Sequence, residues 1–423
     1  MAAAGLAPAR GGGALLLRVH PSRAEHRSRG RDGRCRAHPG RLARPARGRP
    51  PGRRRPGRGP HDDPQALRRL VLLTVRCITI TYNVISAPEP PMHMANEVLT
   101  LPVAGALGAA AAGGLALAAA KARRDLDERR APLLGVLGAF VFAAQMVNFP
   151  VLPGTSGHFV GAALLAVVLG PHAAALGMAA IVIVQCVVFQ DGGLLALGAN
   201  LVNMALAGPY AAWLAFRAIA PAGRPAIRAR LYLAAFLAAL ASILAGALLV
   251  PLEVAASGIC RVPLSVFLGT MAGIHTLIGA AEGVLTFMVL AALARMRPDL
   301  LPGAPAAAGG LPLRAVAGSV ALAALLVAGF LSLAASGAPD GLESTLDRTQ
   351  ALDTERPNPA AEAAGHAGGA IALLPDYSGP GGAWYWTSVA GVCGVLLVLG
   401  LGAAGARALR GRPAAPHGHA HHH

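Results

Sequence analysis

Two adjacent residues, Met92 and His93, have the types and the order needed to chelate a metal ion. When a histidine is the second residue of a chain, the terminal amine, the next amide nitrogen and the imidazole can bind one ion in fused chelate rings. Such an all-nitrogen, planar donor set suits Ni(II) or Cu(II). The chelate requires Met92 to be the first residue of the mature chain, because an internal peptide bond removes the amine. The alternative interpretation is an ordinary loop histidine.

A second histidine, His158, ends a stretch rich in proline and glycine that begins at Asn148. Irregular backbone at membrane depth is tolerated only where it lines a cavity or is buried in protein. An ionisable group in such a place is by default a candidate functional group. The sequence therefore predicts His158 at the outer mouth of a membrane span, with Asn148 as a possible supporting residue. The alternative is a histidine that only hydrogen-bonds a neighbouring carbonyl.

Three further polar residues lie at the end of a hydrophobic run or inside one. Asp191 follows such a run and either attracts a cation or caps the next helix. His275 and Glu282 are seven residues apart in one run, about two helical turns, so both are expected on one helix face. Intramembrane His and Glu normally face the bundle interior. We expect this pair to hold helices together, and we keep all three as supporting residues of the cavity.

The composition determines which class of protein must position these residues. Of the 423 residues, 54% are hydrophobic and 13% are charged, whereas soluble domains carry about 25% charged residues. Aromatic residues make up only 4%, so the apolar mass is small side chains that let membrane helices approach closely. The sequence therefore predicts an all-α polytopic membrane protein rather than a soluble enzyme. The five cysteines form no CxxC, so no disulfide framework or thiolate metal site is indicated.

Nine hydrophobic segments are candidate membrane spans, seven in a main body and two after a linker. The third is short for a bilayer that needs about 20 residues. The predicted spans are Val98–Ala120, Leu133–Val151, His158–Gly170, Ala173–Phe189, Leu195–Ile219, Leu231–Val250, Leu264–Leu293, Ala315–Ala335 and Ala383–Ala406.

The placement of charge gives an orientation for these spans. Every cluster of basic residues in the body and after it follows an odd-numbered span, and the opposite side is acidic. Since basic loops stay in the cytoplasm, we expect Met92 and the polar loop Ser336–Gly382 outside a bacterial plasma membrane. The C-terminus is then cytoplasmic.

The first 91 residues differ from the rest, because they hold 19 Arg and 5 acidic residues. This Arg/Pro-rich stretch cannot bury a core. Three interpretations compete for this stretch. It is a disordered basic arm that binds lipid or nucleic acid, or it is a secretory signal, or it is not made because translation starts at Met92. We expect the last, and therefore no nucleic-acid partner. The predicted divisions are 1–91, a 92–293 body, a 294–314 linker, a 315–406 two-span domain and a 407–423 His-rich tail whose role stays open.

Four strings together resemble the substrate-capture subunit of cobalt/nickel energy-coupling factor transporters, the CbiM/NikM family. They are the opening Met-His-Met, NFPVLPGTSGH, FQDGGLLALGAN and HTLIGAAEG, all within Met92–Leu293. The resemblance implies a seven-helix capture domain. It also implies that the Met92 amine, the amide and imidazole nitrogens of His93, and His158 hold the ion. The 91-residue extension departs from the family pattern, because it would abolish the amine ligand.

The polar loop carries a second resemblance. Its Pro339-Asp340-Gly341-Leu342-Glu343 string, followed later by Leu-Leu-Pro-Asp-Tyr, is similar to the PDGLE domain, a two-helix companion related to CbiN/NikN. The chain thus resembles a fusion of both parts. The resemblance implies separate ATP-binding (CbiO/NikO-like) and coupling (CbiQ/NikQ-like) partner subunits. Consistently, the sequence contains no GxxxxGK[ST] phosphate-binding motif.

These observations predict a membrane subunit that captures Co²⁺ or Ni²⁺ for ATP-driven import. The ion is cargo, and no prosthetic group is expected. The rival hypothesis is a membrane-embedded, metal-dependent enzyme that uses His275 and Glu282, although the sequence has no HExxH. The choice between cobalt and nickel stays open, and nitrogen donors slightly favour nickel.

Overall fold

The computed structural model describes residues 93–125, 130–220, 228–302, 310–353 and 357–409. The arginine-rich extension, Met92, the middle of the predicted linker and the histidine-rich tail lie outside these residues. The described residues are mostly helical, which confirms the predicted fold class.

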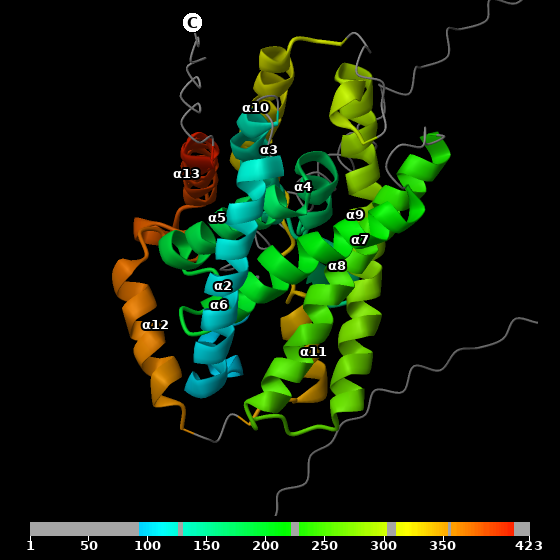
Figure 1. Cartoon of the computed structure of the whole chain (residues 1–423). Helices are drawn as coiled ribbons and strands as arrows, with labels where there is room; N and C mark the ends of the chain where they lie inside the picture. The colour runs from blue at the N-terminus through cyan, green and yellow to red at the C-terminus, as the bar shows by residue number, and fades with distance from the viewer. Residues whose placement is uncertain (1–92, 126–129, 221–227, 303–309, 354–356, 410–423) are drawn as a thin grey trace, which may run out of the picture. The chain divides into compact units, whose positions relative to one another are not determined.

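Long apolar helices form the frame of the described chain (Figure 1). Among the described residues, five helices are long and apolar enough to cross a membrane. They are α2 (Leu101–Asp125), α5 (Pro171–Phe189), α8 (Arg228–Ala256), α9 (Leu264–Met296) and α13 (Tyr385–Leu409). Two shorter apolar helices, α3 (Ala131–Gln145) and α10 (Leu313–Gly329), correspond to the second and eighth predicted spans.

The third predicted span, His158–Gly170, differs most from its expectation. Only Ala162–Leu169 is helical there, as α4, and all eight of its residues are buried. Eight residues rise about 12 Å, so α4 does not cross a bilayer by itself. Gly161 and Gly170, with φ of 75° and 87°, bound the helix, and α5 begins at once with Pro171. The segment is therefore a short helix enclosed by the protein.

The fifth predicted span is one helical run with a change of winding in its middle. It consists of α6 (Leu197–Asn200), a π-helical segment (Leu201–Ala207) and α7 (Gly208–Ile219). π-helical turns are rare and often mark functional sites. Here the wide turn carries Asn203, whose side chain reaches the cavity described below.

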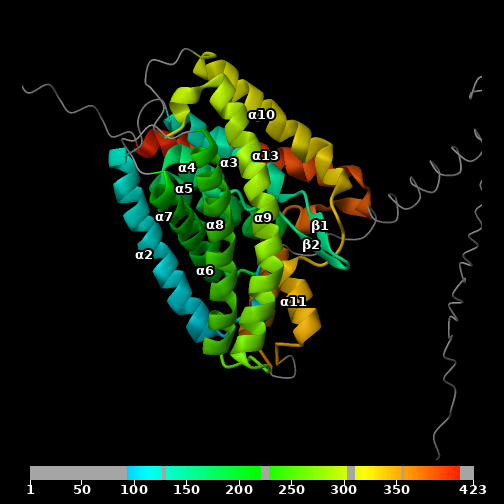
Figure 2. The same cartoon turned by 90° about the vertical axis from the view of Figure 1, so that its right-hand side faces the viewer.

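A small hairpin replaces the end of the second predicted span. Strands β1 (Phe149–Leu152) and β2 (Thr155–Gly157) pair antiparallel, with Phe149 opposite Gly157. Gly154 in the turn has φ of 71°, a conformation that favours glycine. Figure 2 shows the hairpin beside α9 and α11 (Gly341–Thr349).

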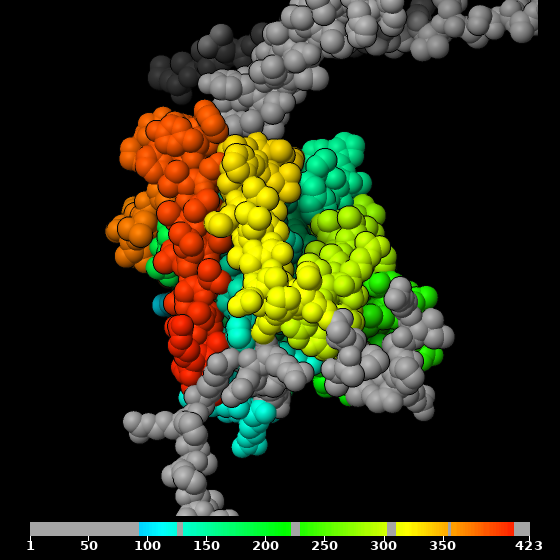
Figure 3. All heavy atoms as spheres, turned by 90° about the horizontal axis from the view of Figure 1, so that it is seen from above, coloured from blue at the N-terminus to red at the C-terminus, as the bar shows by residue number. Residues whose placement is uncertain are grey.

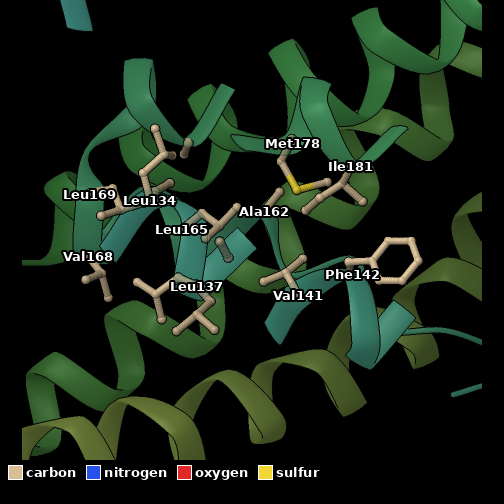
Figure 4. Close-up of a cluster of buried hydrophobic side chains, with 14 of the residues drawn as sticks. Leu134, Leu137, Val141, Phe142, Ala162, Leu165, Val168, Leu169, Met178 and Ile181 are labelled. Atoms are coloured by element: carbon tan, nitrogen blue, oxygen red, sulfur yellow. The ribbon is translucent and has the colours of Figure 1, made fainter. Parts of the chain in front are cut away.

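The hydrophobic core lies around the short helix α4. Figure 4 shows side chains of α3, α4 and α5 filling the space between them, including Leu134, Phe142, Leu165 and Met178. A Cβ added to Gly135 of α3 would lie 2.8 Å from the Leu399 carbonyl oxygen of α13. Small residues thus allow these two helices to pack backbone against backbone.

The C-terminal part packs its two apolar helices on this core. Figure 3 shows α10 and α13 side by side on one face, and both contact α3. The segment between them holds α11 and α12 (Pro359–Ile371). Short 3₁₀ turns complete the described elements: Asn96–Val98, Pro298–Leu300, Leu331–Ala334, Pro375–Tyr377 and Pro380–Gly382.

Candidate metal-binding site

The arm that carries His93 is held in place by its neighbour, Met94. The Met94 amide donates to Oδ1 of Asn200 over 3.2 Å, and its carbonyl accepts from the Gly193 amide over 2.9 Å. Asn200 also donates to that carbonyl through Nδ2, over 3.3 Å. These contacts pair the arm with the segment that follows α5, as an additional strand would pair, and so fix the point at which His93 enters the protein.

Gly192 explains why the two segments approach so closely. Its φ is 94°, and a Cβ there would lie 2.7 Å from Cβ of His93. A side chain at this position would both strain the backbone and displace the histidine. The Gly-Gly pair after Asp191 is thus needed for the arm to lie against the C-terminal end of α5.

The His93 ring is fixed by Asp191. Its Nδ1 lies 2.9 Å from Oδ1 of Asp191, and both side chains are 1% exposed. Nε2 is buried and has no hydrogen-bond partner. A chelate that joins the ring to the amide nitrogen of the same residue closes through Nδ1, which is the atom that contacts Asp191 here.

His158 meets His93 from the other side. It follows strand β2, and its Nδ1 is also buried without a hydrogen-bond partner. The ring centroids of His93 and His158 are 6.1 Å apart. A metal ion bound at about 2.0–2.1 Å from a ring nitrogen lies roughly 3 Å from the ring centroid. The two rings, 65 positions apart in sequence, thus lie at about twice that distance from each other.

The two histidines share a cavity of about 100 Å³. The lining also includes Asn203 and Ser242, whose side-chain oxygens are buried without partners. Among the described residues, no three His, Cys, Asp or Glu side chains form a complete metal-binding group, so two imidazoles need further donors.

The four predicted supporting residues have different places. His275 lines the cavity, and its Nδ1 donates to the Met271 carbonyl over 2.9 Å. Asp191 contacts His93 but is not part of the cavity lining. The Asn148 side chain is buried without a partner, outside the cavity lining.

Glu282 lies outside the cavity lining and binds backbone groups. Its carboxylate accepts from the amides of Val160 and Gly161, over 2.8 and 3.1 Å. It thereby ties α9 to the segment that follows His158. Among the described residues, no hydrogen bond joins His275 to Glu282. Each side chain instead forms hydrogen bonds with backbone groups, which is not the arrangement of a catalytic pair.

The loop after α10 closes the cavity, and this docking was not predicted. The Ser156 amide donates to the Pro339 carbonyl and its hydroxyl to the Ala338 carbonyl, each over 2.7 Å. The Thr155 and Ser344 hydroxyls are 2.6 Å apart. Strand β2 thus binds the loop next to His158. The PDGLE string was the only signal in the sequence for this contact.

Asp340 brings a carboxylate to the cavity wall with Gly341 and Leu342. Its Oδ1 accepts from the Glu343 amide over 2.8 Å and caps helix α11. Burial raises the pKa of the Asp340 carboxyl to about 7, and burial also raises the pKa of Glu343 to about 6. A Cβ on Gly341 would lie 2.9 Å from Nε2 of His275, so glycine is needed where the loop passes that ring.

Residues 93–300 match the family described as "Cobalt uptake substrate-specific transmembrane region", and residues 314–411 match the PDGLE domain. The "Putative fused nickel transport protein NikMN" of Archaeoglobus fulgidus is 35% identical over 312 residues, 74% of this chain and 97% of that protein. The chain belongs to this cobalt-uptake family. The predicted resemblance and the fused PDGLE domain are both confirmed.

Other relatives agree. The "Fused nickel transport protein NikMN" of Rhodobacter capsulatus is 34% identical, covering 69% of this chain and 91% of its own. The "Cobalt transport protein CbiM" of Geobacter sulfurreducens is 31% identical, covering 62% and 79%. A solved "Truncated Transition metal Transporter" is 29% identical, covers 48% of this chain and 98% of its own, and has a TM-score of 0.42. The family match and the apolar helices identify the chain as a multi-pass membrane protein of metal uptake.

Proposed function

We propose that this chain is the substrate-specific subunit of an energy-coupling factor importer for Ni²⁺ or Co²⁺. It captures the ion from outside, and separate ATP-binding and coupling subunits (CbiO/NikO-like and CbiQ/NikQ-like) drive release inward. Nitrogen donors favour Ni²⁺ over Co²⁺. The proposal places Met92 and the polar loop outside the cell and the C-terminus inside.

One observation carries the proposal: two imidazoles from distant segments lie with their centroids 6.1 Å apart, and each has a buried ring nitrogen without a partner. An orphaned buried polar atom costs free energy of about 1–3 kcal/mol, which an ion or water held there recovers. The proposed ligand set is the amine of Met92, the amide and imidazole nitrogens of His93, and the imidazole of His158, which together supply strong donors as the ion loses its water. Closing this chelate transfers Nδ1 of His93 from Asp191 to the ion. Mass spectrometry of the natively expressed N-terminus tests the amine, because a chain that begins before Met92 has none there.

Uptake of ⁶³Ni or ⁵⁷Co by cells tests the site. We expect His93→Ala and His158→Ala each to abolish uptake at normal membrane levels of the protein. His366→Ala is the matched control, since His366 is an exposed histidine on α12. Normal uptake by a well-expressed His158→Ala variant would refute the proposed site.

Accessibility tests the orientation. A cysteine at Gly365, on α12, should react with an impermeant thiol reagent in whole cells. Labelling that requires lysis would place the loop inside the cell and contradict the predicted topology.

A further inference from the structure

Three polar side chains line the cavity on elements that carry neither His93 nor His158. They are Asn203 on the π-helical segment, Ser242 on α8 and His275 on α9. Helices α8 and α9 pack side by side (Figure 2). None of the three side chains belongs to the proposed ligand set, so the cavity has a polar wall that the proposed function leaves unexplained.

The orientation of the Asn203 amide is set by two partners. Its Nδ2 donates to Oε2 of Glu253 over 3.0 Å and to the Met94 sulfur over 3.7 Å. A carboxylate and a thioether accept hydrogen bonds and do not donate them, so the NH₂ group lies on their side. The other amide atom, Oδ1, is left buried without a partner, and Asn203 as a whole is 4% exposed.

Ser242 and His275 also offer acceptors. The Ser242 hydroxyl is buried without a partner, and the residue is 3% exposed. His275 donates its Nδ1–H to the Met271 carbonyl, so the lone pair of the neutral ring is on Nε2. Met271 lies on the same helix, so this bond ties no two helices together. It fixes the tautomer and leaves Nε2, beside Gly341 in the cavity lining, as an acceptor.

Packing brings these side chains to one wall of the cavity. A Cβ on Gly208 would lie 3.2 Å from Oγ of Ser242 and 3.6 Å from the Asn203 backbone oxygen, so the two residues meet beside this glycine. The residue after Ser242 and the residue before His275 pack in one buried apolar cluster. The three acceptors therefore come from neighbouring positions of three elements.

We propose that Asn203, Ser242 and His275 form a subsite for the hydrated ion, which they hold through its waters before the nitrogen donors replace those waters. A divalent cation polarises its bound waters, which therefore donate hydrogen bonds and need a wall of acceptors. A buried acceptor without a partner is costly, and a hydrated ion supplies the missing donors. Asp340, in the same lining, adds a carboxylate that attracts a cation. The inference rests on the proposed function, since it requires an ion that enters this cavity.

Ser242→Ala in the natively expressed, purified chain tests the proposal, because it removes only the hydroxyl. A subsite that the ion uses on entry and on exit lowers the barrier in both directions. We therefore expect the association and dissociation rate constants for Ni²⁺, measured by rapid mixing with a chromogenic chelator, each to fall about tenfold, which corresponds to roughly 1.4 kcal/mol. The dissociation constant should stay unchanged, since the nitrogen ligands are untouched. His275→Phe keeps a planar ring without the acceptor and should slow both rates in the same way.

Ser319→Ala is the matched control. Ser319 lies on another apolar helix, α10, where its hydroxyl donates to the Ala315 carbonyl over 2.9 Å. It is exposed and lies outside the cavity lining. We expect this variant to bind and release Ni²⁺ at the rates of the unmodified chain.

Three results would overturn the inference. The first is an unchanged association rate in Ser242→Ala, which would show that the hydroxyl holds only ordinary water. The second is a raised dissociation constant at an unchanged association rate, which would place Ser242 in the final ligand site. The third is an equal slowing in Ser319→Ala, which would show a general effect of deleting a helix hydroxyl. His158→Ala separates the two proposals: if it still binds Ni²⁺, the proposed function fails, whereas loss of binding there with unchanged rates in Ser242→Ala defeats only the subsite.

Discussion

Replacing Glu282 by alanine tests whether this buried carboxylate holds the segment that carries His158. The carboxylate accepts from the amides of Val160 and Gly161, and the Glu282 side chain is fully buried. Removing it leaves one buried N–H group (Gly161) and one partly buried N–H group (Val160) without an acceptor, at about 1–3 kcal/mol each. We therefore expect Glu282→Ala to lower the free energy of unfolding by about 2–6 kcal/mol. Glu282→Gln keeps one acceptor oxygen and should lose about half as much.

Thermal unfolding of the purified chain in detergent measures this effect, and Ni²⁺ titration measures its consequence for the site. Because His158 directly precedes Phe159 and Val160, a loosened segment should also weaken Ni²⁺ binding. Saturating Ni²⁺ should then restore part of the lost unfolding temperature, since a ligand that binds only the folded state stabilises it. This recovery distinguishes a residue that only positions a coordinating histidine from a histidine that itself coordinates the ion.

Glu362→Ala is the control for Glu282→Ala, since Glu362 is an exposed glutamate in the first turn of α12. It should change neither the unfolding temperature nor Ni²⁺ binding. If Glu282→Ala unfolds and binds as Glu362→Ala does, then Glu282 does not support the His158 segment.

Two further predictions concern the fused domain. Gly402→Ala should destabilise the chain by about 1–3 kcal/mol, because the new Cβ would collide with the backbone of Gly135. Gly400→Ala is the control, since a Cβ there meets nothing within 4 Å and should not destabilise the chain. Equal unfolding temperatures for the two variants would contradict the α3–α13 packing. Asp340 has its pKa raised by burial from 3.8 to about 7, so the folded state binds the proton more tightly and stability falls as the pH rises from about 4 to about 7. Asp340→Asn keeps the helix cap and should flatten the dependence of unfolding temperature on pH over that window; an unchanged slope in this variant would contradict the burial of a titrating carboxyl.

Much of the fold could be predicted from hydrophobic length, because lipid exposure requires long apolar helices. The third predicted span shows the limit of that rule. Its residues are apolar because protein surrounds them, and all eight residues of α4 are buried. Hydropathy cannot distinguish burial in protein from burial in lipid. The glycines that bound α4 were visible in the sequence, but their left-handed conformations were not.

The candidate site was predicted residue by residue, but its closure was not. His93 and His158 were each noted from their type and local context, and only the family resemblance placed them in one site. In the structure their ring centroids are 6.1 Å apart. The docked loop and the buried Tyr377 depend on contacts between residues far apart in the chain, such as Ser156 with Pro339. A contact of this kind has no local period or propensity to reveal it. Only the PDGLE and Leu-Leu-Pro-Asp-Tyr strings marked those positions.

The docked loop gives a physical reason for joining the two domains in one chain. Asp340 to Leu342 line the cavity. The Tyr377 hydroxyl donates over 2.7 Å to Asp191, which contacts His93. The C-terminal domain therefore supplies part of the wall around the candidate site and a partner for Asp191. If the domains were separate chains, these contacts would form only after association, at a cost in translational and rotational freedom. Fusion keeps the loop at a high effective concentration beside strand β2, so these contacts form without a separate association step.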